Sequence, residues 1–232
     1  MAANTRTGAP AETRTRAPAK TRTRAPKETR AKILTAAFEE FYQHGFQAGN
    51  MDTIAGNAGV TKGALYHHFT DKTALGYAVV EEVVREPLLA AYLEPLERDE
   101  GDPLAALQHA LRKRADDFTT TGITFGCPLN NLMQEMSAID EGFRTRVAAT
   151  LGTWISAFDD ALVRARERGF VRDDVDTRRV AAFVVAAIEG SFGTAKNADS
   201  VEVLRSNLEV LADFLDTLRQ RAPVGPAGAE RN

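Results

Sequence analysis

Residues 61–69, Thr-Lys-Gly-Ala-Leu-Tyr-His-His-Phe, combine small, basic and aromatic side chains in an order suited to contacting DNA. Gly63 has no side chain, so the backbone there can approach a base or a phosphate closely. Lys62 can reach a guanine edge or a phosphate, and Thr61 can cap a helix whose free N–H groups attract phosphate. A short helix of this kind enters the major groove in helix-turn-helix proteins. The segment therefore predicts a nucleic-acid contact.

The residues upstream predict the partner helix of this motif. Asn50 is a good N-cap, because its side chain can accept a bond from a free backbone N–H. Gly59 permits the turn between the two helices. Leu65 and Phe69 are four residues apart and would anchor the second helix in the core, which leaves Tyr66 exposed.

We predict DNA contacts from one set of polar, aromatic and glycine residues: Asn50, Thr53, Thr61, Lys62, Gly63, Tyr66, His67 and Lys72. The alternative interpretation places Tyr66 in the core and treats the lysines as ordinary surface residues. His67 and His68 are adjacent, and adjacent side chains on a helix point about 100° apart. With no further ligands nearby, we expect no metal site and no cofactor.

Charge is distributed unevenly along the 232 residues. The net charge of −3 divides into +6 for residues 1–30, −1 for residues 31–75 and −8 for residues 76–232. Residues 1–28 repeat Thr-Arg-Thr-Arg-Ala-Pro and lack apolar side chains, which predicts a disordered basic arm. That arm has two open interpretations, a tail that binds phosphates or the minor groove and a solubilising extension.

The whole chain has the composition of a soluble protein. Its 232 residues are 44% hydrophobic, contain one cysteine, and include no spanning apolar segment or secretory signal, so we expect a cytoplasmic protein without membrane contact. Apolar spacing predicts helices over 28–44, 50–58, 61–69, 72–93, 102–121, 128–139, 141–169, 175–197 and 200–220. Pro95, Pro103, Pro128 and Gly169 are expected to separate the later helices.

These residues resemble the TetR family of bacterial transcriptional repressors. The resemblance spans residues 29–75 and rests on Ile33-Leu34, Ala37-Phe38, Gly45-Phe46, Ile54-Ala55, Ala58-Gly59-Val60, Lys62-Gly63, Leu65-Tyr66, Phe69 and Lys72. It implies an all-helical homodimer whose N-terminal domain binds DNA and whose C-terminal domain binds an effector. Effector binding then separates the recognition helices and releases DNA. Gly56 inside the second helix departs from the pattern and should cost that helix roughly 1 kcal/mol relative to alanine.

We accordingly predict an all-α fold with an N-terminal three-helix helix-turn-helix domain and a larger helical domain for effector binding and dimerisation. The expected divisions are a basic arm over 1–28, a DNA-binding domain over 29–75, an effector and dimerisation domain over 76–221 and a flexible tail over 222–232.

The last predicted helix carries an apolar seam at steps of three and four residues: Val201, Leu204, Leu208, Leu211, Leu215 and Leu218. Such a seam packs against other helices. It can lie inside the monomer or between two copies. The family resemblance implies that the last two helices pair with their copies in a dimer. We favour the dimer, because a palindromic operator needs two motifs.

The segment Gly126-Cys127-Pro128 predicts a cysteine at the N-terminus of a helix, where thiol pKa values fall. It resembles the glycine–cysteine segment of a TetR subgroup, some members of which sense electrophiles or oxidants. Those relatives usually have glycine where this chain has Asn130. The alternative is a small apolar residue that lines a pocket or is simply buried.

An effector pocket is expected among the central helices. Its predicted lining is mostly aromatic and sulfur-containing: Cys127, Phe118, Phe125, Asn131, Met136, Trp154 and Phe158. Each of these residues has an alternative role in the plain core.

The sequence therefore predicts a repressor that leaves a palindromic, double-stranded operator when a small-molecule or electrophilic effector binds. One alternative is an architectural or ligand-independent DNA-binding protein. A helical enzyme is a weaker alternative, because the four histidines are scattered at 44, 67, 68 and 109 and no nucleophile and base stand together.

Overall fold

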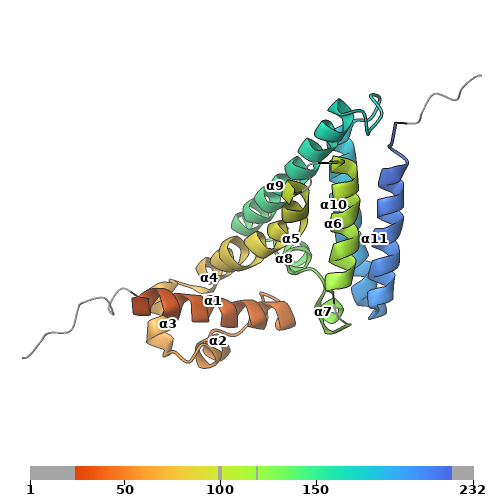
Figure 1. Cartoon of the computed structure of the whole chain (residues 1–232). Coiled ribbons are helices and arrows are strands. Elements are labelled where there is room, and N and C mark those ends of the chain that lie inside the picture. The colour runs from red at the N-terminus through yellow and green to blue at the C-terminus, as the bar shows by residue number, and fades with distance from the viewer. Residues whose placement is uncertain (1–23, 99–100, 119, 221–232) are drawn as a thin grey trace, which may run out of the picture.

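The computed structural model describes residues 24–98, 101–118 and 120–220, and these residues fold into helices (Figure 1). A single antiparallel bridge between Val171 and Arg219 is the only extended pairing within these ranges. The predicted all-α class is confirmed. Most of the predicted basic arm and the predicted tail over 222–232 lie outside the described residues.

Three helices at the N-terminal end form one unit at the lower left of Figure 1: α1 (Arg24–His44), α2 (Met51–Asn57) and α3 (Lys62–His68). Helix α1 begins four residues before the predicted Glu28, so residues 24–28 are helical and the arm prediction is wrong for them. Pro26 is compatible with this start, because the first N–H groups of a helix need no intrahelical acceptor. The helix ends before Gly45, whose positive φ of 84° matches the predicted left-handed position.

A continuous helical path leads from this unit into the larger domain. It consists of α4 (Lys72–Val79), a π-helical turn η1 (Val80–Val84) and α5 (Arg85–Arg98). The predicted helix over 72–93 is present, but Pro95 does not end it, and α5 continues to Arg98. A proline removes one hydrogen bond near the end of a helix, where few remain to be made.

The larger domain contains six further helices: α6 (Pro103–Asp117), α7 (Thr120–Phe125), α8 (Pro128–Met136), α9 (Glu141–Glu167), α10 (Thr177–Ala198) and α11 (Val201–Asp216). In Figure 1, α6, α10 and α11 run alongside one another and α9 crosses beside them. The predicted single helix over 102–121 is wrong at its C-terminal end. Helix α6 stops at Asp117, because Phe118 adopts an extended backbone and turns the chain into α7.

The predicted seam of α11 lies inside the monomer. Its six residues, Val201, Leu204, Leu208, Leu211, Leu215 and Leu218, are at most 9% exposed. Helix α11 packs most extensively against α6 and α10 of the same chain. The favoured assignment of this seam to a dimer interface is therefore wrong. An apolar stripe specifies that a helix is covered, and the stripe alone does not specify by which helix.

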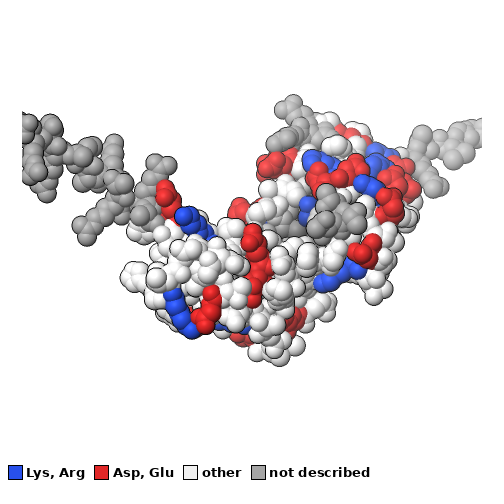
Figure 2. All heavy atoms as spheres, turned by 90° about the horizontal axis from the view of Figure 1, so that it is seen from below, with Lys and Arg blue, Asp and Glu red and all other residues white. Residues whose placement is uncertain are grey.

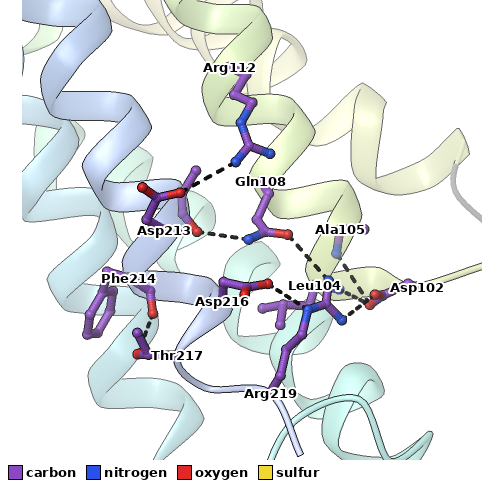
Figure 3. A network of polar contacts seen from close by, with 11 residues as sticks. Asp102, Leu104, Ala105, Gln108, Arg112, Asp213, Phe214, Asp216, Thr217 and Arg219 are labelled. Atoms are coloured by element: carbon purple, nitrogen blue, oxygen red, sulfur yellow. Dashed lines mark hydrogen bonds and ion pairs between the residues drawn. The ribbon is translucent and has the colours of Figure 1, made fainter.

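A polar network closes the end of this packing, where α11 meets the start of α6 (Figure 3). Arg219 donates to Asp102 at 2.6 Å and to Asp216 at 2.8 Å. Asp102 also caps α6 by accepting from the N–H groups of Leu104 and Ala105. Gln108 donates to the Ala212 carbonyl at 2.8 Å. One guanidinium thus joins the cap of α6 to the end of α11.

We predict that Arg219→Met lowers the free energy of unfolding by about 1–2 kcal/mol, chiefly because the charge-assisted bond to the half-buried Asp102 is lost, while the exposed Asp216 contributes little. Urea denaturation followed by circular dichroism measures the change. The control is Arg205→Met, which removes ion pairs to the exposed Glu202 and Asp116 and should cost less than about 0.5 kcal/mol. Equal losses in the two variants would contradict the bridging role of Arg219.

Candidate DNA interface and effector region

Two side-chain caps define the helix-turn-helix unit. The side-chain oxygen of Asn50 accepts from the N–H groups of Asp52 and Thr53 at the start of α2, and Thr61 accepts from Ala64 at the start of α3. Between the helices, Gly59 has a φ of 65°. The predicted caps and turn are confirmed. Leu65 is completely buried, so the opposite side of α3 faces outward.

The outward side of α3 carries most of the predicted DNA contacts. Thr61, Lys62, Gly63 and His67 are exposed, and Tyr66 is 42% exposed, as predicted. Asn50 and Thr53 are exposed at the start of α2. The structure therefore gathers seven of the eight predicted residues on two neighbouring helix ends.

Gly63 has unused space around it. A Cβ atom built at this position would meet only the Thr61 hydroxyl oxygen, at 4.0 Å. The fold itself therefore does not require glycine here. An external surface that approaches the backbone of α3 gives a physical reason for the missing side chain.

Lys62 is paired within the motif. Its ammonium lies 2.7 Å from a carboxylate oxygen of Asp52, and both side chains are exposed. The hydrogen bond to Asp52 raises the pKa of Lys62. Asp52 was absent from the predicted site, although an acid in the first turn of α2 is a visible sequence feature. DNA binding by Lys62 would exchange or share this partner.

Lys72 is the eighth predicted residue and has a different environment. It is half-buried at the start of α4, where its ammonium donates to the Gln47 carbonyl at 2.9 Å and lies 5.1 Å from the Phe46 ring centre. These contacts join α4 to the turn after α1. A structural role for Lys72 thus accompanies its predicted phosphate contact.

The charge on this side of the molecule is sparse. Figure 2 shows small groups of blue and red atoms separated by wide white areas, with no continuous basic surface on the face shown. Such a surface favours contact through helix ends and hydrogen bonds over binding by bulk positive charge.

Comparison with known proteins assigns the fold to a family. Residues 33–79 match the family described as bacterial regulatory proteins, tetR family, and residues 103–209 match the C-terminal domain of LmrA/YxaF-like transcriptional regulators. The chain belongs to the TetR family. Its fold and helix-turn-helix geometry agree with this membership. It is therefore a DNA-binding transcriptional regulator and not an enzyme.

Individual relatives cover most of the chain. A helix-turn-helix regulator from the lacX 3′ region of Lactococcus lactis is 29% identical over 82% of this chain and 94% of its own length. The repressor DhaR from Mycobacterium sp. strain GP1 is 25% identical over 75% of this chain and 86% of its own. The solved structure of regulatory protein TetR from Rhodobacter sphaeroides is 25% identical, with a TM-score of 0.71 over 80% of this chain and 97% of that one.

The parts of this TetR-family chain that the structure describes contain neither a grouped metal site nor a membrane-spanning helix. Within them, no three or more histidine, cysteine, aspartate or glutamate residues are grouped to hold a metal ion. The rings of His67 and His68 contact each other with centres 5.8 Å apart. No helix in the described ranges is both long enough and apolar enough to cross a membrane.

The predicted effector residues do not line one common cavity. Trp154 and Phe158 are buried in an aromatic cluster with Tyr92, whose ring centre lies 4.3 Å from that of Trp154. Phe118 is half-buried and contacts Phe192, with ring centres 4.7 Å apart. Met136 is buried in the core. These aromatic residues fill the interior of the larger domain.

Phe125 and Asn131 lie elsewhere, in a groove of about 670 Å³ between α1, α7, α8 and α10. Phe125 packs against Tyr42 of α1, and Asn131 donates to the Phe125 carbonyl at 2.8 Å. Lys196 donates to Asn131 at 3.1 Å. The predicted pocket is thus divided between an interior cluster and a surface groove.

Cys127 occupies the N-cap of α8, as predicted, but its thiol is not activated. The residue is 1% exposed, and the thiol donates to Glu189 at 3.4 Å. Burial raises the thiol pKa, and the negative charge of Glu189 raises it further. The expectation of a lowered thiol pKa is therefore wrong, because loss of solvent outweighs the helix N-terminus.

Glu189 was missed by the sequence analysis. It lies on the apolar face of α10, is 6% exposed, and has a pKa raised to about 7, chiefly by burial. Its backbone carbonyl accepts from Asn130 at 3.0 Å. An acid between Ile188 and Phe192 on an otherwise apolar face was the available signal.

Helix α8 also connects this region to the DNA-binding domain. The carboxylate of Glu135 accepts from the N–H groups of Phe46 and Gln47, at 2.8 and 2.7 Å, just after α1 ends. Tyr42 donates to the Gly126 carbonyl at 2.5 Å, next to Cys127. Hydrogen bonds therefore join α8 and the residue pair before it to α1 and the turn after α1.

We predict that Gly63→Ala leaves the free energy of unfolding unchanged or raises it by up to about 1 kcal/mol, because alanine favours the helix and its methyl group has space here. We expect the same variant to weaken operator binding by about tenfold, or ~1.4 kcal/mol, because its methyl group meets DNA. Thermal unfolding and fluorescence anisotropy measure the two effects.

The matched control for Gly63 is Gly56→Ala in α2, where a Cβ atom would meet nothing within 4 Å. It should stabilise the fold without weakening DNA binding. Operator affinity unchanged by Gly63→Ala would remove this residue from the interface.

Glu189 predicts a pH dependence of stability. Its folded pKa of about 7 lies above the ordinary 4.5, so its contribution is fully present below pH 4.5 and is lost as pH rises through 7. The corresponding loss is on the order of 3 kcal/mol by pH 8. Glu189→Gln keeps an oxygen acceptor for Cys127 and should flatten this part of the profile, measured by chemical denaturation at pH 5 to 8. An unchanged profile would show that Glu189 is not the titrating group.

Proposed function

We propose that this TetR-family regulator is a repressor that binds a palindromic operator as a homodimer and leaves it when a small molecule binds the larger domain. The observation that carries the proposal is the exposed start of α3, where Gly63 has no side chain, capped by Thr61 and anchored by Leu65. In a bacterial cell such a protein would act in the cytoplasm, where the operator lies.

In this proposal the DNA contacts divide by chemistry. Lys62, Gly63 and Tyr66 lie toward base edges and supply sequence preference. The remaining predicted contacts bind the phosphate backbone and set the register: Asn50, Thr53, Thr61, His67 and Lys72. The open N–H groups at the starts of α2 and α3 add to the attraction for phosphate.

The proposed dimer uses the outward face of α10 and α11, on the side away from the seam buried within the monomer. Phe183 is 53% exposed and Val210 is 65% exposed, although both are large and apolar. Phe183 packs against Phe214 of α11, with ring centres 5.3 Å apart. Gly190 is exposed on α10 with open space around it, which permits close approach of a second helix. These features support pairing of the last two helices by this face.

The proposed release mechanism uses α8. A ligand that displaces α8 alters the bonds of Glu135 to the end of α1, and α1 carries α2 and α3. In a dimer this changes the separation of the two α3 helices, so they no longer fit adjacent major grooves. We favour an effector that binds without covalent reaction. The thiol of Cys127 is buried and protonated, whereas reaction with an electrophile needs a thiolate.

An architectural DNA-binding protein is the second candidate function. It would draw on the positive charge of residues 1–30, and such a protein binds all sequences alike. The capped α3 with its exposed polar side chains instead favours sequence-specific contact.

We predict that selection from a random DNA pool yields a palindrome with half-sites about one helical turn apart. The double variant Phe183→Glu and Val210→Glu should be monomeric in sedimentation and bind this palindrome at least about tenfold more weakly, because each monomer holds only one half-site.

The matched control is Ile139→Glu, which places the same charge on another large exposed apolar residue, 63% exposed and outside α10 and α11. It should remain dimeric and bind normally. Equal affinity of the wild type for palindromic and mixed-sequence DNA would overturn the repressor proposal in favour of the architectural one.

A further inference from the structure

Seven buried polar atoms of the larger domain have no hydrogen-bond partner of normal geometry among the described residues. Two of them, Arg146 Nε and Asp159 Oδ1, belong to side chains that form ion pairs. The other five come from five different helices: Tyr92 Oη, Arg114 Nε, Asn130 Oδ1, Trp154 Nε1 and Glu189 Oε2. Buried polar groups in folded proteins are nearly always paired, and an unpaired one is costly. Several such atoms in one domain therefore need an explanation.

Contacts show that these groups form one cluster. The Arg114 guanidinium lies 5.6 Å from the Tyr92 ring centre, and the Tyr92 ring packs on Trp154. The positive charge of Arg114 lowers the pKa of Glu189, so the two groups are within electrostatic range. Asn130 donates to the backbone of Glu189. We call these five residues the interior polar cluster.

Three members of the interior polar cluster carry donor groups that bond no acceptor in normal geometry, although the Arg114 guanidinium lies close enough to the Tyr92 hydroxyl to lower its pKa. They are the Nε–H of Arg114, the indole N–H of Trp154 and the hydroxyl of Tyr92. Trp154 and Tyr92 are 0% exposed, so bulk water does not serve them. A ligand that satisfies them must bring acceptor oxygens.

Arg114 also lacks a counter-ion. No carboxylate among the described residues lies within ion-pair distance of its guanidinium, and Glu189 is bonded to Cys127 instead. With a pKa of about 7, Glu189 is protonated in a large share of molecules at neutral pH and then offers Arg114 no full negative charge. The cluster thus has positive character, which favours an anion.

Aromatic rings surround the same guanidinium. The ring centre of Phe118 lies 4.3 Å from Arg114 and that of Phe192 lies 5.7 Å from it. Phe118 and Phe192 contact each other edge to face. These walls favour a flat, apolar body over a flexible or strongly hydrated one.

A groove reaches the cluster from the surface. It has a volume of about 570 Å³ and is lined by Asn130 and Glu189 together with apolar residues such as Met133 and Ile155. This volume lies within the usual range of small-ligand sites, about 300–1,000 Å³. The groove ends at Asn130 and Glu189, so a small ligand would enter the cluster past these two side chains.

We propose that the interior polar cluster binds a small monocarboxylate with a flat, unsaturated or aromatic body, whose carboxylate is held by Arg114, Tyr92 and Trp154. This inference rests on the proposed function, because it assigns a ligand class to the effector of the repressor. Binding would insert the ligand between α5, α6 and α10 and shift α8, which carries Asn130 at one end and Glu135 at the other.

The test uses the full chain and the fluorescence of Trp154, the only tryptophan. Benzoate, phenylacetate and crotonate are titrated beside their uncharged amides. We expect saturable quenching by at least one carboxylate and at least about tenfold weaker binding of its amide, because the amide has no charge for Arg114. Arg114→Met should weaken binding of the carboxylate by at least about tenfold, and Tyr92→Phe should weaken it by about three- to tenfold.

The matched control is Arg112→Met, on the same helix but paired with Glu209 and Asp213 at the surface. It should bind the carboxylate as the wild type does. If Arg114→Met fails to fold, as judged by circular dichroism, Arg114→Lys replaces it. Arg114→Lys keeps the charge without the planar fork, so we expect intermediate weakening.

Three results would overturn the inference: equal binding of carboxylate and amide, unchanged binding by the Arg114 variant, or no quenching by any of the carboxylates at about 10 mM, far above usual effector affinities. The same carboxylate should release operator DNA from the wild type and Arg112→Met but not from the Arg114 variant. Failure of operator binding without ligand would refute the proposed function separately, because the fluorescence titration uses no DNA.

Discussion

The carboxylate of Glu135 is a direct polar contact between α8 and the DNA-binding domain. It accepts from two backbone N–H groups directly after α1, next to Gly45, whose φ of 84° favours glycine and where a Cβ atom would lie 3.2 Å from the same carboxylate oxygens. Helix α1 in turn packs on α2, and α2 on α3. The unit that carries α3 is therefore joined to α8 by this carboxylate, in addition to the packing of α1 on α4 and η1 and the bond from Tyr42 to Gly126.

Helix α8 has only nine residues, and both of its ends are engaged. At its start, Cys127 and Asn130 are bonded to Glu189 of α10. At its end, Glu135 holds α1. A short helix transmits a shift as a rigid unit, because its backbone hydrogen bonds resist internal deformation. In the proposed release mechanism, this arrangement is the route between the interior of the larger domain and the DNA-binding domain.

The proposed DNA-binding surface is built from shape more than from charge. Lys62 is neutralised locally by Asp52, and Gly63 is bare although the fold has room for a side chain. A surface of this kind discriminates through close backbone approach and hydrogen-bond geometry, while its weak net charge limits binding to unrelated DNA. The acidic larger domain acts in the same direction, because its negative charge repels phosphates outside the motif.

Local signals in the sequence determined the helix-turn-helix unit, since each depends on atoms a few residues apart. Asn50 and Thr61 cap their own helices, Gly45 and Gly59 take positive φ angles, and Leu65 faces the core by its spacing. The family resemblance and the all-helical class were predicted from the same short-range patterns. The start of α1 and the effect of Pro95 were not, because both depend on which terminal hydrogen bonds the fold leaves free.

Tertiary structure decided the questions that involve distant partners. The seam of α11 predicted a covered face, and only the packing against α6 and α10 placed it inside the monomer. The helix N-terminus predicted a reactive Cys127, but burial against Glu189, 62 residues away, reverses the direction of its pKa shift. The sequence gives no reason to group Arg114, Tyr92 and Trp154, because they lie on three different helices that only the fold brings together. A sequence determines local hydrogen bonds and apolar periodicity, whereas desolvation and the choice of packing partner arise only when the whole chain is folded.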